Sequence, residues 1–91
     1  MLTVYKYPVA GPNFFSLNLP LGAKILTAQV QNGELQLWAL VNSKNKTETR
    51  LFLLVGTGQS IRESEGELCY IGTFQLEGGA IVYHLFETAR I

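Results

Sequence analysis

The stretch that decides the fold is LTAQVQNGELQLWA, residues 26–39. At its centre Asn32-Gly33 favours positive φ at both positions, as a two-residue type I′ hairpin turn requires. Counting outward from this turn predicts a register in which Leu26 lies opposite Ala39. One predicted face is apolar: Leu26, Ala28, Val30, Leu35, Leu37 and Ala39. The other holds Thr27, Gln29, Gln31, Glu34, Gln36 and Trp38. A shift of one residue would mix these sets, so the register is well specified.

A second hairpin is predicted around the glycine pair at 78–79. Counting outward pairs Leu76 with Ile81 and, farther along, Thr73 with His84. Both faces of this hairpin hold apolar residues near its open end. That pattern is typical of strands covered on two sides, or packed against another subunit.

Further short strands are expected at residues 2–7, 14–19 and 49–55, the last apolar on both faces. Residues 60–68 read as a loop, although Ser60 and Glu63 have capping-box spacing. Closely spaced turn signals and the lack of helical periodicity predict one all-β domain over residues 1–91. We expect a small antiparallel barrel or sandwich of six or seven short strands, built from hairpins.

Composition narrows the class of protein. Hydrophobic residues make up 47% of the chain and charged residues 15%, against about 25% charged in an average domain. This excludes disorder and indicates apolar surface beyond one small core, so we expect a homo-oligomer. Seven basic residues balance seven acidic ones, which argues against a nucleic-acid polymer as partner.

The expected location is the cytoplasm. Cys69 is the only cysteine, which excludes an internal disulfide. The N-terminus lacks the pattern of a signal peptide, and no apolar run approaches the roughly 20 residues that span a bilayer. We therefore expect no membrane association.

Catalytic and metal sites are not indicated. His84 is the only histidine and aspartate is absent; Thr73 and His84 are expected to form a cross-strand hydrogen bond. Cys69 reads as a buried structural thiol, because no nearby cation would activate it. Such a residue set does not make a zinc site. An alternating acidic run reads as solvated loop: Glu63, Glu65 and Glu67. We expect a non-enzymatic protein without metal or cofactor; the enzymatic alternative is a small hydrolase using His84.

Trp38 stands out as an aromatic residue on a polar face, beside Gln29 and Gln36. It could anchor a subunit interface, since tryptophan is enriched in binding hot spots. It could stack on a planar ligand such as a nucleobase. A third use is a minor core beneath a loop or the N-terminal strand.

The loop that starts with Gly56-Thr57-Gly58 follows a buried strand. Its backbone could direct N–H groups at a phosphate, or it could be a tight strand exit that needs positive φ. Together with the tryptophan face and two arginines, it defines the candidate ligand-binding set: Trp38, Gln36, Gln29, Thr57, Gln59, Arg50 and Arg62.

Several segments carry a family resemblance: residues 5–7, 19–26, 29–33, 37–41, 56–58, 70–75 and 78–87. In these the chain resembles a family of short, functionally uncharacterised proteins of phages and their bacterial hosts. The resemblance implies a stand-alone accessory protein inside a bacterium. By analogy of setting, we expect a sponge that sequesters a small nucleotide-type signal of host immunity, with Trp38 as stacking surface. The alternative is an inhibitor or scaffold that binds a host protein.

Overall fold

The Asn32-Gly33 turn organises the fold as expected. In the computed structural model, which describes residues 1–11, 13–62 and 66–89, Asn32 has φ 51° and Gly33 has φ 79°. The positive values at both positions are those of a type I′ turn. The described residues form seven strands: β1 (Leu2–Pro8), β2 (Asn13–Pro20), β3 (Lys24–Gln31), β4 (Glu34–Asn42), β5 (Thr47–Gly56), β6 (Leu68–Leu76) and β7 (Ile81–Thr88).

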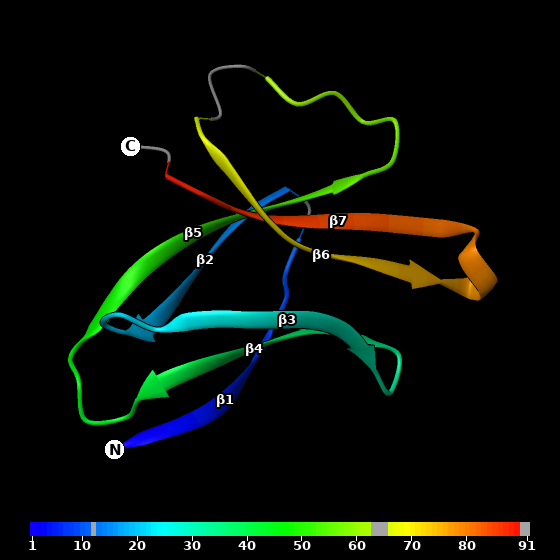
Figure 1. Ribbon diagram of the computed structural model, residues 1–91. Helices are drawn as coiled ribbons and strands as arrows, with labels where there is room; N and C mark the ends of the chain where they lie inside the picture. Colours follow the sequence, from blue (N-terminus) through cyan, green and yellow to red (C-terminus); the bar gives the residue numbers. More distant parts are fainter. Residues whose placement is uncertain (12, 63–65, 90–91) are drawn as a thin grey trace.

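Two antiparallel sheets pack as a sandwich, which decides the choice between sandwich and barrel (Figure 1). The three-stranded sheet has the order β1-β4-β3, and the four-stranded sheet has the order β2-β5-β7-β6. Hairpins join β3 to β4 and β6 to β7, whereas β1–β4 and β2–β5 pair strands that are far apart in the chain. None of the described segments forms a helix long and apolar enough to cross a membrane.

The first hairpin keeps the predicted register from Gln31 opposite Glu34 to Thr27 opposite Trp38. A bulge then follows, and Ile25 rather than Leu26 lies opposite Ala39. The predicted place of Leu26 in the core is therefore wrong: its side chain is 46% exposed, while Ile25 packs against the core. A bulge adds one unpaired residue and exchanges the faces beyond it.

The second hairpin also keeps the predicted pairs, Leu76 with Ile81 and Thr73 with His84. Its turn is longer than a glycine dipeptide, because a short 3-10 segment, η2 (Glu77–Gly79), has positive φ throughout. A second bulge, at Ile71, shifts the register toward the open end. The loop expected at residues 60–68 contains no helix in its described part; Glu63 and Glu65 lie outside the described residues.

The core lies between the sheets. Its largest fully buried side chains are Phe52, Phe74, Leu19, Leu37, Leu85 and Val41. Phe15 stacks on Phe52 with ring centroids 5.3 Å apart. Each such side chain contributes roughly 1.5–3 kcal/mol relative to an exposed one, so this layer holds the two sheets together.

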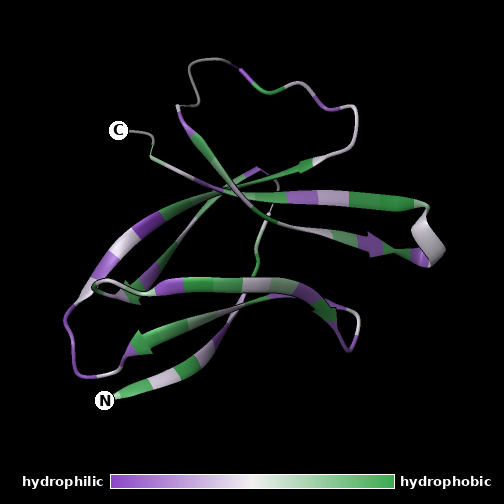
Figure 2. Ribbon diagram, in the orientation of Figure 1, coloured by the Kyte–Doolittle hydropathy of each residue, from purple (hydrophilic) through white to green (hydrophobic). Residues whose placement is uncertain are grey.

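Strand β5 is buried on both faces, as its sequence predicts, and Figure 2 shows hydrophobic residues along its second half. Phe52 and Leu54 belong to the core between the sheets. Leu53 and Val55 alternate with them, and they are only 3% and 4% exposed on the outer side. The chain itself thus buries both faces of this strand.

Candidate functional site

The outer face of the three-stranded sheet carries Trp38. Because its neighbours Leu37 and Ala39 are buried in the core, strand alternation turns Trp38 away from it. Register places Lys6 of β1 on one side of Trp38 and Thr27 of β3 on the other. The indole is half-buried, so one part of it faces solvent.

The two glutamines predicted to accompany Trp38 lie on this same face. Gln36 sits two residues along β4, opposite Gln29 of β3. Gln36 is 7% exposed, and its Nε2 donates to Glu34 Oε2 at 3.4 Å. The structure therefore brings these three predicted residues together, with Gln29 as the exposed amide.

Apolar side chains continue the face toward the other end of the sheet. Leu2 and Val4 of β1 are 68% and 50% exposed, and Val4 lies opposite the half-buried Leu40. We call Leu2, Val4, Trp38 and Leu40 the outer apolar band. A contiguous exposed patch of this kind is more informative than scattered apolar residues.

Two lysines border the outer apolar band. Lys6 lies beside Trp38, and Lys24 lies beside Leu40. Lys6 Nζ donates to Gln31 Oε1 at 2.8 Å. In the part of the chain that the structure describes, neither lysine forms an ion pair with a carboxylate. The face therefore combines apolar surface with two lysines that form no ion pair in the described residues.

A different cluster lies on the outer face of the four-stranded sheet. The His84 ring contacts Thr57 Oγ1 through Nε2 at 2.7 Å and Thr73 Oγ1 through Nδ1 at 3.1 Å. Thr73 Oγ1 also contacts the Tyr70 hydroxyl at 2.5 Å. The expected cross-strand bond between Thr73 and His84 is thus confirmed. We call the four residues the hydroxyl–imidazole chain.

The glycine loop is a tight strand exit. Gly58 has φ 85°, and Gly56 N donates to Gln59 Oε1 at 3.0 Å. Thr57 N donates to the carbonyl of Val82 at 3.2 Å, and Gln59 Nε2 donates to Asn13 Oδ1 at 2.7 Å. These donors are occupied within the chain, which favours the strand-exit interpretation over a phosphate loop.

Arg50 is also occupied. Its Nε and Nη2 donate to the two carboxylate oxygens of Glu87 at 2.6 and 2.7 Å, and Nη1 donates to the carbonyl of Ala23. Hydrogen bonding to Glu87 raises the pKa of Arg50 above its ordinary value, and burial opposes this increase. A forked pair of this kind is a strong, charge-assisted contact.

The predicted ligand-binding set does not form one pocket. Trp38 projects from the outer side of one sheet, whereas Thr57 bonds His84, which alternates with core residue Leu85 and so faces outward from the other sheet. Arg50 turns to the inner side, and Arg62 is exposed on the loop after β5. These side chains lie apart because alternate residues of a strand point to opposite faces and because the strands belong to two different sheets.

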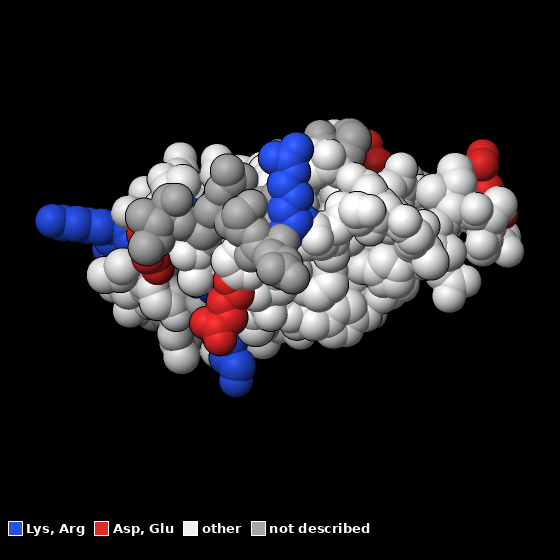
Figure 3. Space-filling view, turned by 90° about the horizontal axis from the view of Figure 1, so that it is seen from above, with Lys and Arg blue, Asp and Glu red and all other residues white. Residues whose placement is uncertain are grey.

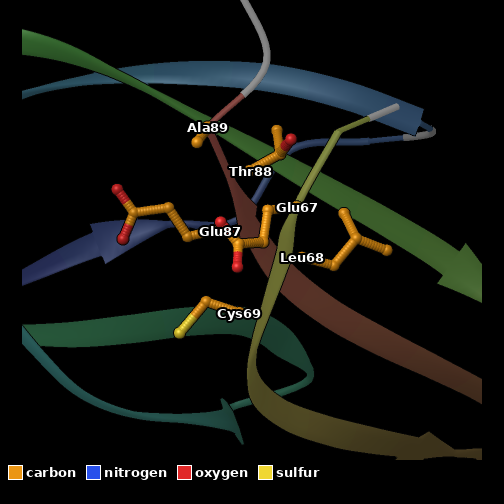
Figure 4. Close-up of a pocket in the computed structure, with 6 residues that line it drawn as sticks. All are labelled: Glu67, Leu68, Cys69, Glu87, Thr88 and Ala89. Carbon is orange, nitrogen blue, oxygen red and sulfur yellow. The ribbon is translucent and has the colours of Figure 1, made fainter. Parts of the chain in front are cut away.

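A shallow pocket of about 400 Å³ lies where β6 begins and β7 ends; Figure 4 shows its lining residues, Glu67, Leu68, Cys69, Glu87, Thr88 and Ala89. Cys69 is exposed, so its prediction as a buried thiol is wrong. It lies near the start of an edge strand, where β7 flanks it on one side only. Among the described residues no three His, Cys, Asp or Glu side chains are placed to hold a metal ion.

Sequence reasoning missed Lys6, Lys24 and Tyr70. The neighbours of Trp38 on β1 depend on a pairing across more than 30 residues, and Tyr70 reaches Thr73 beside a bulge. Neither relationship has a local sequence signal. In the view of Figure 3, which shows the molecule from above, charged groups are scattered among uncharged surface rather than forming a basic track.

Residues 1–90 match the model of a family described as a domain of unknown function, DUF7352. No curated protein matches the chain, and no solved structure does.

Proposed function

Since the chain belongs to the DUF7352 family, a domain family defined without an activity, we propose a function from its surface: it is a non-enzymatic module that binds a partner protein. The outer apolar band is the binding surface. The observation that carries this proposal is the high exposure of Leu2 and Val4, 68% and 50%, on the sheet face that also holds Trp38. Soluble proteins rarely leave contiguous apolar surface without a use.

Charge defines the partner. Lys6 and Lys24 border the band without carboxylate partners in the described chain. The complementary surface is apolar at its centre and carries Asp or Glu at its rim, because opposite rim charges guide association. Trp38 would be the central anchor, as tryptophan often is in hot spots. In the phage setting that the resemblance suggests, the partner is a host protein that this chain inhibits or recruits.

The test starts with a photo-crosslinking amino acid at position 40, with position 75 on the other sheet as control. A protein crosslinked from position 40 alone is then purified and its affinity measured. We expect Trp38→Ala to weaken binding at least about tenfold, or 1.4 kcal/mol. Lys6→Glu with Lys24→Glu should slow association and reduce its salt dependence, while Gln75→Ala should bind normally.

Unchanged affinity of the Trp38→Ala protein for the purified partner would overturn the proposal. Light scattering coupled to gel filtration adds a second check. A dimer that Trp38→Ala dissociates would assign the outer apolar band to a second copy of the chain, and the partner-protein proposal would then be rejected.

A second candidate function is the binding of a small nucleotide-type signal, as in the sponge hypothesis. The register of Lys6 beside Trp38 favours it, since an ammonium next to an indole suits a phosphate attached to a base. Trp38, Gln36 and Gln29 would act with Lys6, without Thr57, Gln59, Arg50 or Arg62. Calorimetry against cyclic and ADP-ribose-type nucleotides should show heat that Trp38→Ala abolishes. No heat, with no 260 nm absorbance from bound nucleotide in the native protein, would reject it.

A hydrolase is the least supported function. Both ring nitrogens of His84 contact threonine hydroxyls, so Thr73 stands where catalytic triads have a carboxylate. An activity that survives His84→Ala would remove this residue from any mechanism.

A further inference from the structure

The hydroxyl–imidazole chain lies on the opposite side of the sandwich from the outer apolar band. Tyr70 and Thr73 come from β6, His84 comes from β7 and Thr57 follows β5. Three contacts join the four groups in a line that runs from the Tyr70 hydroxyl to Thr57 Oγ1. A site on this side is therefore independent of the surface that carries the proposed function.

Counting protons shows what this line presents to solvent. With a neutral ring the four groups carry four protons, namely three hydroxyl protons and one ring N–H. Each of the three contacts uses one of them. One hydroxyl proton is left to point outward, and the remaining free positions are lone pairs. A neutral chain is therefore mostly an acceptor surface with a single outward donor.

Protonation of His84 changes this pattern. The imidazolium has two N–H groups, which donate to Thr57 and Thr73. The Thr57 proton then points outward, and so does one proton of the Thr73–Tyr70 pair. Two outward donors and a positive charge replace one outward donor on a neutral line. This combination matches the acceptor oxygens of an oxyanion, because charge-assisted hydrogen bonds to such groups are the stronger kind.

Among the described residues, the strand neighbours of the His84 ring include no charged group that would repel an anion. The neighbours of His84 on this face are Val55 on β5, Thr73 on β6, and Val82 and Phe86 on β7. Tyr70, whose ring meets Phe86 edge-on with centroids 5.8 Å apart, is the only other titratable member of the line. Val55 is 4% exposed and forms an apolar floor beneath the ring, while the three contacts of the line are exposed.

We propose that the hydroxyl–imidazole chain is an oxyanion-binding site that protonation of His84 activates. Its ligand class is a carboxylate or a phosphate ester. On protonation the site gains one outward hydroxyl donor and the charge of His84, and the Tyr70–Phe86 pair forms an aromatic edge. Binding should be tighter in acidic than in alkaline solution.

Sulfate is a suitable probe because its charge is constant between pH 5 and 8. His84 is the only histidine in the chain, so its ring signals in a nuclear magnetic resonance spectrum need no further assignment. We expect saturable shifts of these signals on adding sulfate at pH 5.5, against chloride at equal ionic strength. At pH 8 the apparent affinity should be weaker by about tenfold, the equivalent of about 1.4 kcal/mol.

Variants separate this site from general anion effects. Thr57→Val should reduce sulfate affinity at pH 5.5, because it removes one outward donor. Tyr70→Phe should change the affinity much less, because the Thr73 proton is then free to point outward. Thr27→Val, an exposed threonine on the other sheet, should bind as the unchanged protein does. Tyr70→Phe is the safer variant for folding, because the Tyr70 ring is already 59% exposed.

Two further probes distinguish a carboxylate ligand from a phosphate ester. They are acetate, used at pH 6 to 8, and dimethyl phosphate, and the charge of each is constant over the range in which it is used. Tighter acetate binding indicates a carboxylate, and tighter dimethyl phosphate binding indicates a phosphodiester; both outcomes support the site. Identical His84 signals in sulfate and chloride at pH 5.5 would overturn it. So would a sulfate response that remains in full in a folded Thr57→Val protein.

Discussion

Ala28 of β3 and Gly72 of β6 meet so closely that a Cβ atom on Gly72 would lie 3.3 Å from the Cβ of Ala28 and 3.4 Å from its carbonyl oxygen. The two strands are edge strands of different sheets. Face-to-face sheets usually lie about 10 Å apart, so this corner of the sandwich is unusually tight. Two of the smallest residues allow the backbones to approach there.

We predict that enlarging Gly72 opens this corner and destabilises the protein. Gly72→Val should lower the free energy of unfolding by about 1–3 kcal/mol, the usual cost of overpacking, as measured by urea denaturation. Gly56→Ala is the control, because the nearest atom to its added Cβ is 3.8 Å away. A Gly72→Val protein as stable as the unchanged one would show that the strands can separate without cost.

We predict that a side chain at Gly33 in the type I′ turn destabilises the protein through backbone conformation alone. Gly33 has φ 79° and an added Cβ would meet nothing within 4 Å, so Gly33→Ala tests backbone strain without a clash. It should cost about 1–2 kcal/mol of unfolding free energy, the penalty of a left-handed backbone for an L-residue. Asn32→Gly, which keeps positive φ accessible, should change stability by much less. Equal effects of the two substitutions in urea denaturation would contradict this account.

We predict that the protein loses stability when either Arg50 or Glu87 can no longer form the two-bonded contact between them. The side chains are 18% and 24% exposed, so the pair is shielded from most solvent. Glu87→Gln and Arg50→Lys should each cost about 1.5–3 kcal/mol, measured by thermal and urea unfolding. Glu48→Gln should cost less, because that carboxylate accepts one exposed bond from Gly22 N at 3.2 Å and acts on Arg50 only through its charge, as the smallest of the effects that raise the pKa of Arg50. A cost for Glu48→Gln as large as that for Glu87→Gln would refute the role of the fork.

We predict that the Tyr7 phenol makes the free energy of unfolding depend on pH in the alkaline range. Burial, with a smaller effect of Tyr5, raises the pKa of Tyr7 above its ordinary value of 10.0. The folded state therefore holds the phenol proton more tightly than the unfolded state, and this contribution is complete below pH 10 and declines as the pH rises above it. Relative to the unchanged protein, Tyr7→Phe should gain stability between pH 10 and 11 but not between pH 6 and 8. A constant difference in unfolding free energy over the whole range would contradict the assignment.

The hairpins illustrate what local patterns predict. Asn32-Gly33 and the alternation around it predict the turn and most of the register, because both depend on residues adjacent in the chain. The same holds for the pairing of Thr73 with His84. The bulges at Leu26 and Ile71 escape this reasoning, because each lies in a run where neighbouring residues are all compatible with a strand.

The candidate sites were only partly predictable. The shared face of Trp38, Gln36 and Gln29 could be predicted, because it depends on alternation within one hairpin. The position of Lys6 beside Trp38 follows from a pairing between the first and fourth strands, which has no signature in either segment. The exposure of Cys69 likewise depends on β6 being an edge strand.

Composition and turn chemistry were enough to predict an all-β fold of hairpins and to place the indole on the same face as two glutamines, because these properties arise between residues a few positions apart. The assignment of strands to two sheets came from long-range packing of the apolar faces. That packing put the indole and the imidazole on opposite sides of the molecule, since side chains of a sandwich that point away from its core must diverge.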